Sequence, residues 1–358
     1  MLEARAAVRN LHAYRPPLAG RVGLRLDFNE STVGCSPRVL ARLRSLDSEL
    51  LARYPEREPV EKDVAAFLGL DPAQVLLTNG VDEAIHLLCC AYLDPGDEAL
   101  IVVPTFAMYA IFAQAEGARV VEVRAGDNFT FPAQDLLAQL SLRTRLIAVA
   151  NPNNPTGAAV AGNVLVQIAQ AAPQAAVLVD EAYFEFHGET LIDQIPQIEN
   201  LFVARTFSKA YGLAGLRIGI LAGEARQTET VRRVASPYNV NAAALAVLPE
   251  ALQDQEYVNR YVAQVLSNRD RLQQELGNLG LHYWRSHANF VLVRIGSAHG
   301  EFVQALRSCG ILVRDRNTDP GCEGCVRLTV GNDGHTEALI SALRNVVVQL
   351  GLRNGVQV

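Results

Sequence analysis

Lysine is scarce in this chain of 358 residues: Lys62 and Lys209 are its only lysines, and arginine supplies nearly all of the basic charge. The 38 acidic residues outnumber the 32 basic ones, which gives a formal net charge of -6 and an isoelectric point near 5.7. This lack of positive charge argues against nucleic acid or an anionic membrane surface as the main partner.

Long apolar runs are missing as well. No run reaches the roughly 18 apolar residues that a membrane-spanning helix needs. The first five residues, Met1-Leu2-Glu3-Ala4-Arg5, lack the apolar stretch of a signal peptide. We therefore expect a cytoplasmic protein without a membrane partner. The chain has no low-complexity tract and no internal repeat, and its length predicts two domains.

Cysteine is limited to six residues, which fits buried thiols in a reducing compartment. Cys89 and Cys90 are adjacent on an expected helix and cannot easily pair with each other. Cys322 and Cys325 form a C-x-x-C motif, a pattern that can indicate redox or zinc chemistry. Because the motif is solitary and runs into a strand pattern, we interpret it as a turn with incidental cysteines. We expect no metal site.

What the chain does contain is a regular alternation of strand and helix patterns. Short β-branched runs recur between segments of helical period, at 75–78, 100–103, 120–123, 146–150, 176–179 and 201–204. Such runs predict a parallel sheet that helices cover on both faces. In sheets of this kind ligands bind at the carboxyl ends of the strands.

The regions on either side have a different texture. Residues 1–34 are irregular apart from a strand-like stretch at 24–28, and Ser36 followed by Pro37 then predicts the start of a helix. Residues 242–277 have helical period and predict one or two long helices. A smaller alternation follows, with strands near 290–293, 311–313 and 325–330 and helices at 301–308 and from 336. We predict an N-terminal arm (1–34), a large α/β domain (35–241) and a small α+β domain (242–358).

The strongest chemical signal lies in the stretch 206–217. Lys209 stands among small and apolar residues, with Thr206 and Ser208 before it and Arg217 eight positions after it. A partly buried lysine loses its proton more easily, and only the neutral amine attacks a carbonyl. The hydroxyls and the guanidinium are donors that a phosphate needs. Together they suggest pyridoxal 5′-phosphate held as a Schiff base; a surface lysine on a helix is the alternative for this stretch read alone.

Other polar groups also follow expected strands. The segment 151–157, Asn-Pro-Asn-Asn-Pro-Thr-Gly, comes directly after one strand, and Asp180 follows another. A carboxylate after four buried apolar residues is costly unless it is paired, and a pyridinium nitrogen would be a natural partner. Gly80 leads into a helix whose first N–H groups would suit a phosphate. The alternative at Gly80 is a strand–turn–helix corner without a ligand.

Three motifs in this order resemble the fold-type-I pyridoxal-phosphate aminotransferases of class II: the segment at 151–157, Asp-Glu-Ala-Tyr at 180–183 and Thr-x-Ser-Lys-x-x-x-Leu-Ala-Gly-Leu-Arg at 206–217. Finer features resemble the histidinol-phosphate aminotransferase branch, namely Arg53-Tyr54-Pro55-Glu56 and the segments 104–109, 311–315 and 326–331. The resemblance runs from about Asn10 to the last helix. It implies an α/β fold with a mostly parallel central sheet, a small α+β domain and an N-terminal arm, and it implies a homodimer.

The resemblance also implies a role for each matching residue around the cofactor ring. Lys209 would be the Schiff-base lysine and proton shuttle, and Asp180 would keep the pyridine nitrogen protonated. Tyr183 and Asn154 would form hydrogen bonds to the ring oxygen. Phe106 would stack on the ring; a tyrosine is frequent at this position, so this chain loses a hydroxyl there and keeps the stacking surface.

Further residues would hold the two anionic groups. The cofactor phosphate would bind a set of backbone and side-chain donors, namely Val81, Asp82, Thr206, Ser208 and Arg217, while Tyr54 would reach it from the partner subunit. The substrate's anionic end would bind Arg327, Arg314 and Tyr14.

The chain departs from the family pattern after Asn29-Glu30. It has Ser31-Thr32-Val33-Gly34 where relatives often have an asparagine or tyrosine and a proline. The resemblance therefore does not determine the path of the arm at this point.

The implied reaction is transamination of L-histidinol phosphate with 2-oxoglutarate, which gives imidazole acetol phosphate and glutamate in histidine biosynthesis. Two alternatives share the scaffold: an aromatic amino-acid aminotransferase and a threonine-phosphate decarboxylase. A third belongs to another class, a non-catalytic sensor that binds pyridoxal phosphate. Such sensors usually carry a DNA-binding domain ahead of the fold, whereas here we expect only a short arm, and the chain is acidic.

Overall fold

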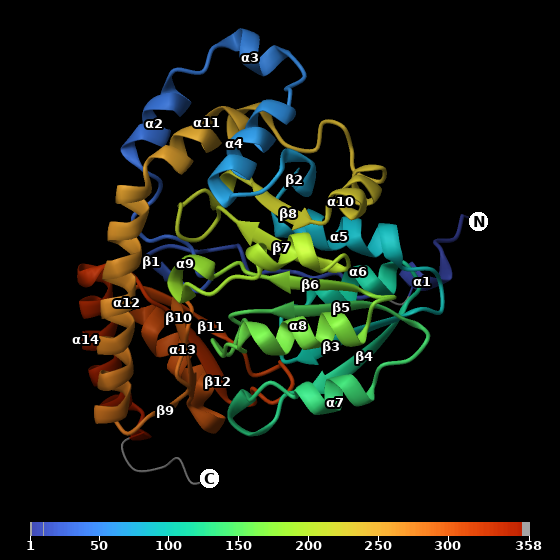
Figure 1. The fold of residues 1–358 in the computed structure, drawn as a ribbon. Helices are drawn as coiled ribbons and strands as arrows, with labels where there is room; N and C mark the ends of the chain where they lie inside the picture. The colour runs from blue at the N-terminus through green and yellow to red at the C-terminus, as the bar shows by residue number, and fades with distance from the viewer. Residues whose placement is uncertain (1, 10, 353–358) are drawn as a thin grey trace.

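Two β-sheets organise the chain, as Figure 1 shows for the computed structural model. The structure describes residues 2–9 and 11–352. Met1, Asn10 and residues 353–358, which belong to the predicted arm and to the end of the predicted small domain, lie outside the described residues. Within the described part, no helix is both long enough and apolar enough to span a membrane.

The larger sheet has seven strands in the order β2-β8-β7-β6-β5-β3-β4. Their bounds are β2 (Val75–Thr78), β3 (Glu98–Val103), β4 (Arg119–Arg124), β5 (Thr144–Ala150), β6 (Ala176–Asp180), β7 (Leu201–Thr206) and β8 (Gly219–Gly223). Strands β4, β3, β5, β6 and β7 run parallel to one another, whereas β8 runs antiparallel to both β2 and β7. The prediction of a mostly parallel sheet is therefore confirmed. Strand β8 is not among the predicted strands because glycines at both of its ends weaken its local signal.

Helices cover both faces of this sheet because its central strands are apolar on both sides (Figure 1). Along β6, Leu178 belongs to the core beneath α5 (Val81–Tyr92) and α6 (Met108–Ala115). Its neighbours Val177 and Val179 belong to the opposite core, beneath α7 (Ala133–Ala138) and α8 (Gly162–Ala171). Successive residues of a strand point to opposite faces, so a continuous apolar run serves two cores.

At one end of the large sheet lie α2 (Pro37–Arg44), α3 (Ser48–Ala52) and α4 (Glu58–Leu68), which pack on α11 (Ala242–Gln253). The predicted start of α2 is confirmed: the Ser36 hydroxyl accepts a hydrogen bond from the Val39 amide at 3.2 Å, and Pro37 occupies the first helical position. The remaining short helices are α1 (Ala6–Arg9) on α6, α9 (Phe184–His187) and α10 (Ala225–Arg232).

The smaller sheet has the order β1-β11-β12-β10-β9. Its strands are β1 (Leu24–Leu26), β9 (His282–Tyr283), β10 (Phe290–Arg294), β11 (Ile311–Asp315) and β12 (Cys325–Thr329), and its helices are α12 (Gln255–Asn278), α13 (His299–Ser308) and α14 (Asp333–Gln349). Strand β1 comes from the predicted arm and pairs in parallel with β11. The residues after β1 thereby lie between the two sheets. The domain boundaries themselves stay a prediction.

Candidate active site

Lys209 follows β7 in the turn that leads to β8, and its Nζ atom donates a hydrogen bond to the carbonyl oxygen of Phe28 at 3.0 Å. The pKa of Lys209 is lowered to about 8, mainly by burial and next by the nearby guanidinium of Arg327. A neutral amine is therefore accessible near physiological pH. Phe28 belongs to the segment 27–30 directly after β1, so the predicted arm forms part of the surroundings of this lysine.

Asp180 is the last residue of β6 and is only 5% exposed. Its carboxylate accepts hydrogen bonds from the Tyr109 hydroxyl at 2.6 Å and from the Ala182 amide at 3.0 Å, and no salt bridge to it is found among the described residues. Burial raises its pKa to about 6. Burying a carboxylate is costly unless a cation pairs with it, and the described residues offer Asp180 only two neutral hydrogen-bond donors.

Tyr109 was not among the predicted site residues. It lies on α6, 71 positions before Asp180, and its side chain is 1% exposed. The sequence signal that could have found it is its place in the segment 104–109, which follows the carboxyl end of β3. A polar hydroxyl on the buried face of a helix needs a partner, and the end of a neighbouring strand is where such a partner lies.

Tyr183 is also buried, and its hydroxyl accepts a hydrogen bond from Asn29 Nδ2 at 2.9 Å. Burial raises the pKa of Tyr183, so the phenol stays protonated. Asn29 has a left-handed backbone (φ 55°) and is held by Thr329 and Asn289. This network answers the open question about the arm: the Asn29 turn docks on β12 and carries a polar side chain to Tyr183. Asn29, Asn289 and Thr329 were not predicted as site residues.

Arg327 lies within β12 and contacts the same segment. Its Nη2 atom donates to the carbonyl oxygen of Asp27 at 2.7 Å, and its Nη1 atom donates to Asn154 Oδ1. Burial lowers the pKa of Arg327 to about 10. Its Nε atom is buried and has no hydrogen-bond partner among the described residues. A buried guanidinium without a carboxylate is prepared for an anionic ligand.

Arg314 lies opposite Arg327 in the antiparallel pair β11–β12. Its guanidinium carbon is 5.2 Å from the centre of the Phe28 ring, and no salt bridge of Arg314 is found among the described residues. The neighbouring Asp315 instead pairs with His299 at 2.9 Å. Arg314 and Arg327 therefore lie side by side on adjacent strands, and neither forms a salt bridge with a carboxylate of the described residues.

The start of α5 and the turn before β8 form a cradle of donors. Gly80 precedes the helix with φ +76°, and a Cβ atom there would lie 2.5 Å from Arg217 Nη2. Arg217 also donates to the carboxylate of Asp82 at 2.9 Å. On the other side, the Ser208 amide donates to the Thr206 hydroxyl at 3.1 Å. The free N–H groups of α5 and the guanidinium converge on one place, as a phosphate requires.

The remaining predicted residues lie further out. Phe106 is partly buried and meets the Tyr109 ring edge-on, with the ring centres 5.9 Å apart. Tyr54 is 77% exposed and stacks on Tyr238 at 4.2 Å, in the loop between α3 and α4. Tyr14 is 44% exposed, and it is near enough to Arg327 to affect that residue's pKa. Cys322 and Cys325 are free, buried thiols; Cys322 lies in the turn before β12, and Cys325 is the first residue of that strand.

The residues present fit pyridoxal 5′-phosphate. The cradle between Gly80 and Arg217 would take its phosphate, since a Cβ atom at Gly80 would fill that space. Asp180 lacks a cation, which a protonated pyridine nitrogen would provide. Lys209 has the lowered pKa that a bond to an aldehyde carbon needs.

Comparison with known proteins gives a consistent result. The family model described as aminotransferase class I and II matches residues 21–343. The chain is 33% identical to the histidinol-phosphate aminotransferase of Caldanaerobacter subterraneus subsp. tengcongensis, over 90% of this chain and 93% of that protein. It is 36% identical to that of Dinoroseobacter shibae, over 89% of this chain and 90% of that protein. Its fold is similar to the crystal structure of histidinol-phosphate aminotransferase from Sinorhizobium meliloti in complex with pyridoxal-5′-phosphate, with a TM-score of 0.89 and 26% identity over 98% of this chain and 99% of that one.

Proposed function

The chain belongs to the class I and II aminotransferase family, and on that basis we propose that it transfers the amino group of L-histidinol phosphate to 2-oxoglutarate. The products are imidazole acetol phosphate and glutamate, which makes the reaction a step of histidine biosynthesis. The observation that supports this substrate is the pair Arg314 and Arg327 on adjacent strands, neither with a carboxylate partner among the described residues. A phosphate dianion has more charge and more acceptor oxygens than a carboxylate, and two arginines suit it.

The enzyme is a pyridoxal-phosphate-dependent aminotransferase. When bound, the cofactor supplies an electron sink for the electron pair of the substrate's Cα atom. In the first half-reaction the Nζ atom of Lys209 would accept the proton that leaves the Cα atom of the amino donor, and in the second it would donate a proton to the Cα atom of the glutamate that forms. With a pKa of about 8, roughly half of these amines are neutral at pH 8, whereas an ordinary lysine would be almost fully protonated.

The other residues of the proposed site orient the cofactor and bind its charged groups. Asp180 would keep a proton on the ring nitrogen of the cofactor, and the Tyr109 hydroxyl and the Ala182 amide hold its carboxylate in place. Tyr183, aligned by Asn29, and Asn154 would bind the ring oxygen. Phe106 would cover the ring face, and Arg217, Thr206 and Ser208 would bind the phosphate with the first amides of α5, at Val81 and Asp82.

We further propose that the enzyme is a cytoplasmic homodimer in which Tyr54 reaches the cofactor phosphate of the partner subunit. The exposure of Tyr54 and its position in a surface loop support this role, because the side chain makes no hydrogen bond within the described part of its own chain. Tyr14 would join Arg314 and Arg327 at the anionic end of the substrate.

The test of substrate class is the variant Arg314→Ala. A charge-assisted hydrogen bond contributes about 1.5–3 kcal/mol, so kcat/KM for histidinol phosphate should fall about ten- to a hundredfold. The loss for phenylalanine should be much smaller. Arg344→Ala, which removes a surface arginine paired with Glu275, is the matched control and should leave both values unchanged.

Equal losses for the two substrates would contradict the proposal. Arg314 would then support the fold or a carboxylate site that all substrates share, and an aromatic amino-acid aminotransferase would become the better interpretation. Decarboxylation of threonine phosphate, measured as released carbon dioxide, separates the remaining alternative on the same scaffold.

A further inference from the structure

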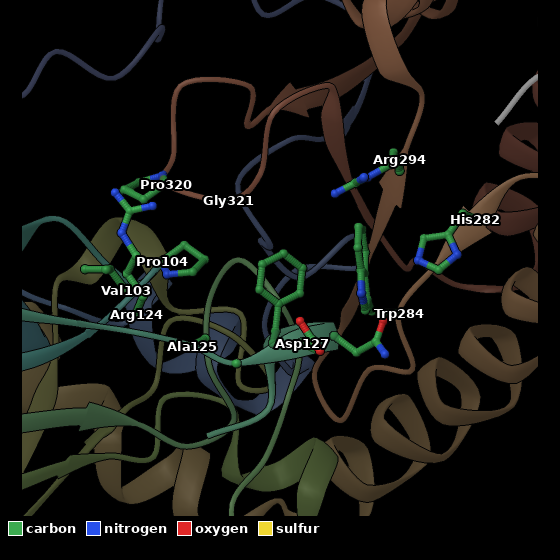
Figure 2. A pocket seen from close by; sticks show the side chains of 13 residues that line it. Val103, Pro104, Arg124, Ala125, Asp127, His282, Trp284, Arg294, Pro320 and Gly321 are labelled. Atoms are coloured by element: carbon green, nitrogen blue, oxygen red, sulfur yellow. The ribbon is translucent and has the colours of Figure 1, made fainter. Parts of the chain in front are cut away.

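A cavity of about 410 Å³ lies between the two sheets, and it shares no residue with the candidate active site. One wall comes from the end of β4 and the turn after it, from Arg124 to Phe129. The opposite wall comes from β9, β10 and the loop at Pro320 and Gly321. Figure 2 shows side chains of both walls pointing toward the space between them. The volume is within the range of small-molecule sites.

Three aromatic side chains, Phe129, Trp284 and His282, line this cavity. Phe129 and Trp284 contact each other with ring centres 4.8 Å apart at an interplanar angle of 59°. His282 stands edge-on to Trp284 at 4.7 Å. The turn that presents Phe129 is strained, because Asn128 and Phe129 both have a left-handed backbone, with φ 55° and 60°. A side chain held in this way keeps a defined ring position, and flat aromatic walls favour a flat ligand.

The charge that lines the cavity is mainly positive. Arg124 and Arg294 both line it, and neither forms a salt bridge with any carboxylate of the residues that the structure describes. Asp127 is the one acidic residue of the lining. The Arg294 guanidinium lies 5.6 Å from the centre of the Trp284 ring, and Figure 2 shows it reaching over that ring toward the middle of the space. Two guanidiniums without a protein carboxylate favour an anionic ligand.

We infer that this cavity is a second binding site, separate from the catalytic one, for a small aromatic compound that carries a phosphate or carboxylate group. The ring would lie against Trp284 and Phe129, and the acidic group would bind Arg294, whose guanidinium lies near the Trp284 ring. Arg124, on the other side of the space in Figure 2, would add positive charge to the lining. Because one wall belongs to the larger sheet and the other to the smaller sheet, a bound compound contacts both.

Trp284 makes the inference directly measurable, since it is the only tryptophan of the chain. Its fluorescence, excited in the purified holoenzyme, should be quenched saturably by phenyl phosphate. Inorganic phosphate and benzyl alcohol, which carry only the charge or only the ring, should bind at least tenfold more weakly. Repeating the titration with benzoate compares a carboxylate with a phosphate on the same ring, and the tighter of the two probes identifies the acidic group that the site prefers.

Two arginine variants test the proposed contacts. Arg294→Gln should weaken phenyl phosphate binding about tenfold or more, and Arg124→Gln, which removes a positive charge from the other side of the lining, should weaken it by a smaller but measurable factor. Arg124 is exposed, so its replacement keeps the test valid even if Arg294→Gln fails to fold. Arg233→Gln on the surface beside α10 is the matched control and should bind like the unaltered enzyme.

A third variant separates this site from the catalytic one. Arg314→Ala should retain the full fluorescence response, because Arg314 does not line the cavity. Loss of the response in Arg314→Ala would place the probe in the active site and overturn the inference. An absent or non-saturating response, or one that is unchanged in Arg124→Gln, would overturn it as well. None of these outcomes depends on which substrate the enzyme transaminates.

Discussion

Asp180, to which we assign a catalytic role in the proposed site, lowers the stability of the folded chain. Its pKa is raised to about 6 because burial outweighs the hydrogen bonds from Tyr109 and Ala182. The folded apoprotein therefore binds a proton at Asp180 more tightly than the unfolded chain does. Its contribution to stability is complete below the ordinary pKa of 3.8, falls as the pH rises toward 6, and remains a constant deficit above that.

We predict that Asp180→Asn stabilises the apoprotein and impairs the holoenzyme. The gain in unfolding free energy at pH 7.5 should be at most about 3 kcal/mol, which corresponds to a shift of about two pKa units, and it should vanish near pH 4. Turnover with cofactor should fall about a hundredfold or more because the ring proton loses its counter-ion. Denaturant unfolding at the two pH values and steady-state kinetics measure the two effects.

The control for this prediction is Asp193→Asn, which changes an exposed carboxylate in the same way and should alter neither quantity. A loss of apoprotein stability in Asp180→Asn would show that the carboxylate is held by the protein and does not await a cation. Near-normal turnover would show that another group holds the ring proton.

At the scale of elements, the start of helix α5 is the place where the cofactor phosphate would bind in the proposed site. Gly80 lies between β2 and α5 with a positive φ, and its missing side chain leaves room for Arg217. Strand β8 packs close behind: a Cβ atom at Gly219 would lie 3.1 Å from the amide of Val81. Both glycines allow backbone and guanidinium to approach one point, which larger residues would prevent.

We predict that Gly80→Ala weakens binding of pyridoxal phosphate about tenfold or more, because the new methyl group displaces the guanidinium of Arg217. Gly69→Ala is the matched control. Gly69 ends α4 in the left-handed region (φ +71°, ψ 28°), and a Cβ atom there would have no neighbour within 4 Å, so the variant costs about 1 kcal/mol of stability without touching the cradle. Gly80, with φ 76° and ψ 172°, lies in a region nearly confined to glycine, so Gly80→Ala should lose more stability than the control. Equilibrium dialysis gives the dissociation constants, and thermal unfolding of the apoproteins gives the loss of stability in each variant.

If both glycine variants bound the cofactor equally well, the place between Gly80 and Arg217 would not be the phosphate site. Equal weakening in both would point to a general effect of stability on binding. Only a loss confined to Gly80→Ala agrees with the proposed cradle.

At the scale of the whole molecule, the proposed dimer makes a prediction about Tyr54. Lys209→Ala and Tyr54→Ala should each be inactive or weakened when pure. A mixture allowed to exchange subunits should regain activity, because one site of the mixed dimer carries both substitutions and the other carries neither. Turnover measured after mixing checks this. Lys209→Ala mixed with Asp180→Asn is the control and should stay inactive, since both residues act within their own chain.

If the Tyr54 mixture recovered no activity while subunit exchange was verified by mass, Tyr54 would act within its own chain or not at all. Recovery in the control mixture would show that a site is assembled from both chains in a different way.

Local patterns in the sequence were enough to predict most elements of the fold. Apolar runs at 146–150 and 176–179 predicted β5 and β6, and Ser36-Pro37 predicted the start of α2, because strand burial and helix capping depend on neighbouring residues. Strand β8 was not predicted. Its short glycine-bounded run becomes a strand only through pairing with β2 and β7 on either side.

The candidate site shows the same division. The sequence by itself determined which residue types stand at the strand ends, Lys209 and Asp180 above all, since the motifs that carry them are contiguous. Only the tertiary structure decided which groups the site residues contact. Tyr109, which donates to Asp180, lies 71 positions from it along the chain, and Asp27, whose carbonyl accepts from Arg327, lies 300 positions from that arginine. Such contacts depend on how the two sheets and the segment after β1 come together, and no local pattern encodes that packing, because its free energy comes from groups far apart along the chain.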